Sequence, residues 1–364
     1  MVGVTLTNGL RFGVCVDDAW RYMGFNPPPS IVIPHIFLVP SISTRIRIKE
    51  AVGRLHFPRK KINLSLVKSL ARTLKESGID YVRFWLQWNF VQPELPAFDA
   101  SPRYNWTMVD TFISVLKQAG IELLPVVGCG YQRMLPRGVD PTRNLAFYVK
   151  AIHESTREIV RRYKGLIRTW QIENEPNWWF AHYVAGWRKG VIWIDPKASK
   201  FRETLLSSLR DAVLAEDCNA QVMINLEIDR SIRNLSFYAR YCDLIGLDYY
   251  PNYSHAGPVD ASSLVPKAKK VFEETGKRVM VCETGYPSGP SLLGYSKALQ
   301  AIYIEKLREA VSDEPLIEAV SIWRLSDSEW KSFPWHENHF GLVEADGTPK
   351  PSWHAYLAWI KKAS

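Results

Sequence analysis

The chain has 364 residues, 46% of them hydrophobic, with 14 Trp and 16 Tyr. This length allows one large domain with long loops, and no Gly/Ser-rich or Pro-rich linker in the middle of the chain marks a second one. The net charge of +9 is mild for this length and includes no run of five like charges. We therefore expect no nucleic-acid partner.

The cysteines and the N-terminus bear on the compartment. Five cysteines are an odd set, so buried thiols in a reducing compartment are the simple interpretation. Residues 1–9 lack a basic segment followed by an apolar core, and the longest apolar run, 31–40, is too short to span a bilayer. We expect neither a signal peptide nor a transmembrane helix, and a cytoplasmic location.

The first predicted strand is followed by an irregular segment. Leu10 to Val16 are typical of a strand, and Asp17 at its end is either a ligand contact or a loop cap. Residues 22–60 break any strand–helix rhythm, with the run Pro27-Pro28-Pro29, then an apolar run and then basic residues. We interpret 22–60 as a long loop insertion. It is either a packed structural insertion or a cover, partner-binding or membrane-surface segment.

Strands and helices alternate along the rest of the chain. Asn63 is placed to cap a helix that runs to about Gly78. Further strands are predicted at 79–86, 121–127, up to 175, 221–226, 243–250, from 278 and 317–323, with helices at 108–118, 144–163, 267–275 and 296–311. A hairpin and a last helix close the chain. This order predicts a single (β/α)8 TIM barrel over 1–364.

A carboxylate stands at the end of the fourth predicted strand. Pro176 cannot donate to a sheet ladder, so we expect this strand to stop at Glu175. Trp178 and Trp179 follow, and burial against such rings would raise the pKa of Glu175 and suit it to donate a proton. The alternative is a strand-end Glu paired with a basic residue, which is also our interpretation of Glu173.

A second strand ends in the same way. The apolar run from Arg278 leads to Glu283 and then to Gly and Pro punctuation. The two carboxylates are 283 − 175 = 108 residues apart, which three strand–helix units of about 36 residues would fill. They would then end strands four and seven of the barrel. Paired carboxylates are what glycoside hydrolysis needs.

The two motifs resemble those of a known group of enzymes. "NEPN" at 174–177 and "ETGYP" at 283–287 are similar to the acid/base and nucleophile motifs of the retaining glycoside hydrolases of clan A. The resemblance implies that Glu175 is the acid/base, that Glu283 is the nucleophile, and that the substrate is a β-glycoside or oligosaccharide. It implies no cofactor and no metal.

Three further segments are similar to family-one β-glycosidases: "RFWLQWNFVQP" from residue 83, "GLDYYPNY" from 246 and the tail from Trp323. The resemblance implies that Arg83 favours the ionised nucleophile and that Tyr250, or else Tyr249, donates a proton to it. Trp323 would floor the sugar site, with further sugar contacts from Glu329, Trp330, Trp88, Asn174 and Asp17. A structural salt bridge for Arg83 and a core position for Tyr250 are the alternatives.

The sequence departs from the family at two places and leaves functions open. Asp248 stands where family one has Asn, and Gly128-Cys129-Gly130 stand near the position of a sugar-binding His. A transglycosidase would use the same carboxylates, and a non-catalytic sugar-binding barrel or a metal-dependent barrel hydrolase are further alternatives. Residues 336–339 (HENH) lack the i, i+4 spacing of a zinc protease, so we expect a solvent-facing or sugar-contacting loop. The sugar and the oligomeric state stay open.

Overall fold

The computed structural model describes residues 9–24, 62–93, 103–128, 136, 139, 145–177, 196–229, 234–253, 255–328 and 335–363. Eight parallel strands follow one another in chain order and close into a barrel, in which β8 pairs with β1. The predicted (β/α)8 barrel is therefore confirmed. The predicted insertion at 22–60 lies outside the described residues from residue 25 onward, as do Cys129, Glu329 and Trp330.

Contacts divide the chain into two compact units. Unit 1 comprises Met1–Val16, Thr73–Arg83 and Asn225–Ser364, and unit 2 comprises Asp17–Arg72 and Phe84–Ile224. Strands β2 (Tyr81–Trp85) and β5 (Gln221–Glu227) and helix α4 (Leu64–Glu76) each have residues in both units.

Unit 1 holds strands β1 (Arg11–Val16), β6 (Leu244–Tyr249), β7 (Arg278–Thr284) and β8 (Ile317–Ile322). These strands are almost wholly buried, as expected for parallel strands covered on both faces. In the register between β6 and β7, Asp248 pairs with Glu283. Two acidic residues are thus neighbours near the carboxyl ends of adjacent strands.

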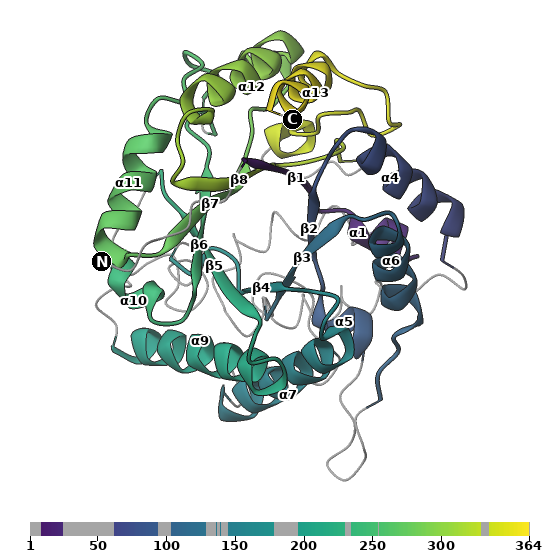
Figure 1. Cartoon of the computed structure of the whole chain (residues 1–364), viewed down its shortest axis with the longest axis vertical. Coiled ribbons are helices and arrows are strands. Elements are labelled where there is room, and N and C mark those ends of the chain that lie inside the picture. The colour runs from purple at the N-terminus through teal and green to yellow at the C-terminus, as the bar shows by residue number, and fades with distance from the viewer. Residues whose placement is uncertain are drawn as a thin grey trace. The chain divides into compact units, whose positions relative to one another are not determined.

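The helices of unit 1 lie outside these strands (Figure 1). They are α10 (Leu235–Ala239), α11 (Leu264–Thr275), α12 (Lys297–Val311) and α13 (Pro351–Ala363). The unit also contains the short 3-10 helices η5 (Ser291–Leu293) and η6 (Trp335–His339). Ser296 caps α12, because its hydroxyl accepts a hydrogen bond from the backbone N–H of Leu299. Helix α13 packs on α12 and reaches β1, where the rings of Trp359 and Phe12 lie 5.2 Å apart.

Unit 2 holds strands β3 (Glu122–Val127) and β4 (Thr169–Ile172) with helices α1 (Ala19–Tyr22), α5 (Trp88–Val91), α6 (Thr107–Gln118), α7 (Leu145–Tyr163) and α9 (Pro196–Glu216). The predicted cap of α4 is confirmed, since Asn63 Oδ1 accepts from the backbone N–H of Leu66 at 3.1 Å. Helix α9 was not predicted. It packs on α7, with Arg157 and Arg161 paired to Glu216.

The predicted end of the fourth strand is wrong. We expected the strand to run to Glu175, but β4 ends at Ile172. Glu173 and Glu175 both have positive φ, 58° and 44°, a left-handed conformation that no strand residue adopts. The chain therefore turns three residues before Pro176, and both carboxylates lie in this turn beyond the strand.

Two further findings concern the compartment predictions. In the described part of the chain, no helix is long and apolar enough to cross a membrane. Of the cysteines described there, Cys15, Cys242 and Cys282 are buried and Cys218 is exposed, and all four are free thiols.

Candidate active site

Glu283 is the best-defined carboxylate of the candidate site. It is the sixth residue of β7 and only 6% exposed. Its Oε1 accepts a hydrogen bond from Nη1 of Arg83 at 2.5 Å, and its Oε2 accepts one from the Tyr250 hydroxyl at 2.9 Å. Both donors stand in unit 1, as Glu283 does. Two donors on different strands or strand ends fix the plane of the carboxylate, and the pair with Arg83 is charge-assisted.

Arg83, the cation paired with this carboxylate, is itself buried. It lies on β2, is 1% exposed, and its Nη1 is 3.6 Å from the Cys15 sulfur. Burial alone would lower the pKa of the guanidinium, but Cys282 and Glu283 beside it raise that pKa well above its ordinary value. Arg83 therefore stays a cation. Burial raises the pKa of the Cys15 thiol to about 12, so this neighbour stays neutral.

The two tyrosines that follow Asp248 point to different partners. Tyr250 donates to Glu283, whereas the hydroxyl of Tyr249 pairs with that of Ser263 at 2.9 Å. Burial, and then the charge of Glu283, raise the pKa of Tyr250 well above its ordinary value. The Tyr250 hydroxyl thus remains protonated and able to donate.

A second buried carboxylate lies next to Glu283. Asp248 is fully buried and accepts a hydrogen bond from the side-chain amide of Asn225, itself fully buried on β5. Gly246 makes room for this arrangement, because a Cβ there would lie 2.8 Å from that of Cys282. Asn225 was not predicted as a site residue, although a polar residue within the apolar run of β5 was a usable signal.

Gly285, two residues after Glu283, allows two strand ends to come together. A Cβ on Gly285 would lie 2.4 Å from the carbonyl oxygen of Trp323, so no other residue fits here without movement. The backbone N–H of Trp323 donates to the carbonyl of Thr284 at 2.8 Å. Trp323 is half-buried and follows β8 directly. The backbone of Trp323, the residue predicted to floor the sugar site, is thus hydrogen-bonded to the strand that carries Glu283.

Aromatic rings continue from Tyr250 to η6. The ring of Tyr250 lies 5.6 Å from that of Phe340 and 6.1 Å from that of Tyr253. Tyr253 in turn packs against His336 at 4.6 Å, and its hydroxyl donates to Glu337. His336 is 7% exposed, and burial lowers its pKa to about 4. The solvent-facing alternative is therefore wrong for His336, which is a packed, neutral imidazole, and the sugar-contacting alternative stays a prediction.

In unit 2, the turn after β4 carries the predicted acid/base. The backbone N–H of Glu173 donates to the carbonyl of Val127 on β3 at 2.9 Å, and the amide of Asn174 donates to Oε2 of Glu175 at 3.3 Å. Two non-glycine residues with positive φ cost about 1–3 kcal/mol each. Such strain persists where the surrounding structure imposes it and is concentrated at functional sites. Glu173 is fully buried and Glu175 is half-buried.

Of the remaining predicted sugar contacts, two lie among the described residues and two do not. Trp88 opens α5, is 6% exposed and donates its indole N–H to Gln92 at 2.7 Å. Asp17 follows β1 in a turn and is half-buried. Glu329 and Trp330 fall outside the described residues. All four roles in sugar binding therefore stay predictions. Among the described residues, no three His, Cys, Asp or Glu side chains are grouped to hold a metal ion.

Comparison with solved structures places the fold among glycoside hydrolases. A hyperthermophilic β-glucosidase from Pyrococcus furiosus has a TM-score of 0.68 at 15% identity, over 99% of this chain and 97% of that one. A family 5 glycoside hydrolase from Streptomyces cattleya, solved with GlcNAc, has 0.67 at 16%, over 98% and 80%. A family 39 glycoside hydrolase from Bacteroides cellulosilyticus has 0.61 at 18%, over 97% of this chain.

The resemblance to clan A glycoside hydrolases that the motifs indicated is confirmed at the level of the fold. Identities of 15–18% show the fold alone. The chain spans 64% of the length of the Bacteroides enzyme. No protein-family model matches the sequence, and no curated protein matches it either. The class of protein defined so far is a (β/α)8 barrel with the fold of glycoside hydrolases.

Proposed function

We propose that this protein is a retaining β-glycoside hydrolase in which Glu283 is the nucleophile and Glu175 is the acid/base. The observation that carries the proposal is the hydrogen bonding of Glu283. A buried carboxylate near the carboxyl end of a barrel strand receives one donor on each oxygen, a cation and a neutral phenol. In a TIM barrel, such an end is the functional face. The shared fold with glycoside hydrolases supports the same reaction class.

Arg83 and Tyr250 have distinct tasks in this proposal. The guanidinium of Arg83 holds Oε1 of Glu283 in place through a charge-assisted hydrogen bond. Tyr250 orients the other oxygen without adding charge. When Glu283 forms a bond to the anomeric carbon, its negative charge disappears. The hydrogen bonds from Arg83 and Tyr250 are then weaker than those to the free carboxylate. They strengthen again when Glu283 leaves the anomeric carbon, so they assist its release in the second displacement.

The reaction has two displacements. In the first, a Glu283 oxygen attacks the anomeric carbon, the glycosidic C–O bond breaks, and Glu175 gives its proton to the leaving oxygen. In the second, Glu175 takes a proton from water, and the water oxygen replaces Glu283 at the same carbon. Two inversions give net retention, and no cofactor or metal takes part. Asn174, Trp323, Trp88, Asp17, Glu329 and Trp330 are the proposed sugar contacts.

A substrate panel and a covalent label test the proposal. Aryl β-glycosides of glucose, galactose, mannose, xylose and fucose should reveal hydrolysis and the preferred sugar together. The 2-deoxy-2-fluoro analogue of that sugar with a dinitrophenyl leaving group should stall at the glycosyl-enzyme. Mass spectrometry of a proteolytic digest should then find the label on Glu283. The label on another residue, or activity lost to a chelator, would contradict the proposal.

The same panel addresses the transglycosidase, which differs only in the acceptor. When a free sugar or an alcohol is added as acceptor, a hydrolase should still give the hydrolysed sugar as its main product. If glycoside transfer products exceed the hydrolysed sugar at low acceptor concentration, the protein is a transglycosidase that uses the same two carboxylates. Sugar binding without turnover of any substrate would instead indicate a non-catalytic barrel.

A further inference from the structure

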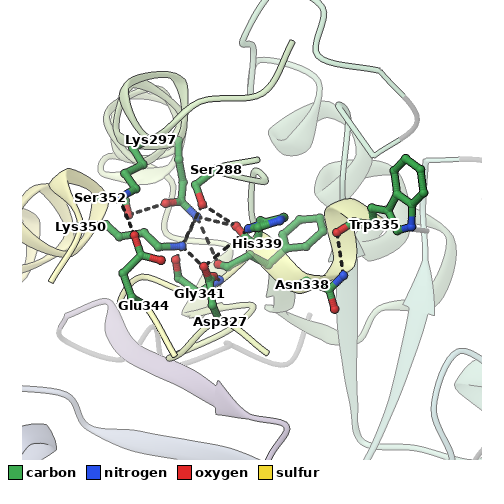
Figure 2. A network of polar contacts seen from close by, with 12 residues as sticks. Ser288, Lys297, Asp327, Trp335, Asn338, His339, Gly341, Glu344, Lys350 and Ser352 are labelled. Atoms are coloured by element: carbon green, nitrogen blue, oxygen red, sulfur yellow. Dashed lines mark hydrogen bonds and ion pairs between the residues drawn. The ribbon is translucent and has the colours of Figure 1, made fainter. Parts of the chain in front are cut away.

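The short helix η6 is fixed on one side by hydrogen bonds (Figure 2). The backbone N–H and the hydroxyl of Ser288 donate to the carbonyl of His339 at 2.8 and 3.0 Å. The backbone N–H of Ser328 donates to the carbonyl of Asn338, and the Asn338 amide donates to that of Trp335 at 2.9 Å. The C-terminal end of this five-residue element is therefore tied to the rest of unit 1, and the bond from Asn338 to Trp335 closes the element on itself.

A buried ion pair stands behind these contacts. Lys350 has a fully buried side chain and pairs with Asp327 at 2.6 Å, and its Nζ also donates to the Ser288 hydroxyl at 2.8 Å. The backbone N–H of Gly341 donates to the same Asp327 oxygen at 2.8 Å. Ser288 therefore links the ion pair to η6. The support of η6 is preorganised, because it rests on buried groups with little freedom to move.

Trp335 stands apart from this support. It is 56% exposed, whereas His336 and Asn338 in the same helix are 7% exposed each. Figure 2 shows its indole on the side of η6 away from Lys350 and Asp327. A single exposed apolar residue needs no explanation in itself. A large aromatic ring is different when the helix that carries it contacts the residues around a candidate catalytic residue.

Contacts within unit 1 link Trp335 to Glu283. Two residues after Trp335, Glu337 accepts the hydroxyl of Tyr253. The Tyr253 ring lies 6.1 Å from the ring of Tyr250, whose hydroxyl bonds Glu283. Helix η6 is thus connected to the proposed nucleophile through Tyr253 and Tyr250. The exposed indole of Trp335 is carried by this connected helix.

We propose that Trp335 binds a second sugar ring of the substrate by stacking. The inference rests on the proposed glycosidase function and adds to it that the natural substrate is a β-linked oligosaccharide. The C–H face of a pyranose is apolar and matches a flat aromatic ring, while its hydroxyls remain in water at the edges. Because η6 is already rigid, the indole loses little freedom on binding.

The test compares a short and a long substrate in three variants. Trp335→Ala removes the ring and Trp335→Phe keeps a smaller one. Leu292→Ala is the matched control, since Leu292 is 84% exposed on η5 in the same unit. The substrates are the phenyl β-glycoside of the preferred sugar and a β-linked trisaccharide from cellotriose, laminaritriose, mannotriose and xylotriose. The measured quantity is kcat/KM for each.

Trp335→Ala should lower kcat/KM on the trisaccharide roughly tenfold and leave the phenyl glycoside within about twofold, a discrimination typical of one lost stacking contact. Trp335→Phe should retain most of the activity, and Leu292→Ala should change neither substrate. Equal losses on both substrates, or no loss on the trisaccharide, would overturn the proposal.

A binding measurement separates this inference from the proposed function. If the natural protein turns over no substrate, the glycosidase proposal fails, yet titration calorimetry with the same four trisaccharides still tests Trp335. Binding to the natural protein that Trp335→Ala weakens roughly tenfold would support the stacking site. Equal binding by both proteins, or no binding of any trisaccharide, would overturn it.

Discussion

The hydroxyl of Tyr250 donates a hydrogen bond to Oε2 of Glu283 at 2.9 Å, while the preceding Tyr249 directs its hydroxyl to Ser263. One step along the chain turns the side chain from one side of the strand end to the other. Two consecutive tyrosines of equal size thus differ in whether they contact the proposed nucleophile. This difference provides a matched pair of variants.

Tyr250→Phe should lower kcat about 10- to 100-fold, the range for one hydrogen bond to a charged group. Tyr249→Phe should have little effect on kcat. Because burial and then the Glu283 charge hold the pKa of Tyr250 well above its ordinary value, the hydroxyl stays protonated, and the loss should be constant between about pH 5 and 9. The measurement is kcat on one aryl glycoside across pH. A larger loss in Tyr249→Phe would show that the wrong tyrosine has been assigned.

The pair of Arg83 and Glu283 should be energetically coupled. Arg83→Met leaves Glu283 buried without its cation, which should lower the free energy of unfolding by about 3–5 kcal/mol. In the background of Glu283→Gln, the same substitution should cost at least about 2 kcal/mol less. Urea denaturation of the four proteins gives this double-mutant cycle. Equal costs in both backgrounds would mean that the two groups do not support each other.

The sequence was informative at the two segments that resemble family-one β-glycosidases. Arg83 and Tyr250 were predicted from this resemblance, and their contacts with Glu283 are present. The end of β4 was missed because Pro176 suggested a later stop. The actual stop is the left-handed φ of Glu173 and Glu175, and glutamate rarely adopts this conformation. No local sequence pattern predicts this backbone conformation at Glu173 and Glu175.

Other parts of the site depend on contacts between distant residues. Lys350 and Asp327 are 23 residues apart, and only the folded chain brings them into one buried pair. Asn225 carries a visible signal, a polar residue in an apolar strand, but its partner Asp248 lies on the next strand. Helix α9 has buried Leu205 and Leu209 at helical spacing, so its existence could have been predicted from the sequence.

His336 should make the fold less stable in mild acid. Burial lowers its pKa from 6.5 to about 4, so between these values the unfolded chain binds a proton that the folded chain does not. Stability therefore falls as the pH drops through this window, by about 2–3 kcal/mol near pH 4.5. His336→Phe keeps the ring against Tyr253 and should remove most of this loss. The measurement is the free energy of unfolding in urea at pH 7 and pH 4.5.

Asp327→Asn serves as the control for this window. Burial would raise the pKa of Asp327, but its interactions with His339 and Lys350 hold it below its ordinary value of 3.8. Its stabilising contribution is therefore present above that value and is lost only as the pH falls below about 4. Asp327→Asn should lower stability similarly at pH 7 and pH 4.5. An unchanged loss between these pH values in His336→Phe would refute the assignment to His336.

Glu175→Gln should remove only one limb of the pH profile of activity. The reaction needs Glu175 protonated and Glu283 ionised, so the activity of the natural protein should be bell-shaped. A Gln cannot lose a proton, so the variant should be much less active and should lack the alkaline limb. The acid limb should remain. If the alkaline limb persists in Glu175→Gln, another group is the acid.

The most direct test of the central claim is the anomer of the glycosyl azide formed by two alanine variants. With a dinitrophenyl β-glycoside, Glu175→Ala should still form the glycosyl-enzyme, because this leaving group needs no proton. Azide should then release it as the β-glycosyl azide by a second inversion. Glu283→Ala cannot form that intermediate, and azide entering the space of the lost carboxylate should give the α-azide by a single inversion. The account predicts β from Glu175→Ala and α from Glu283→Ala; the reverse pattern would contradict it.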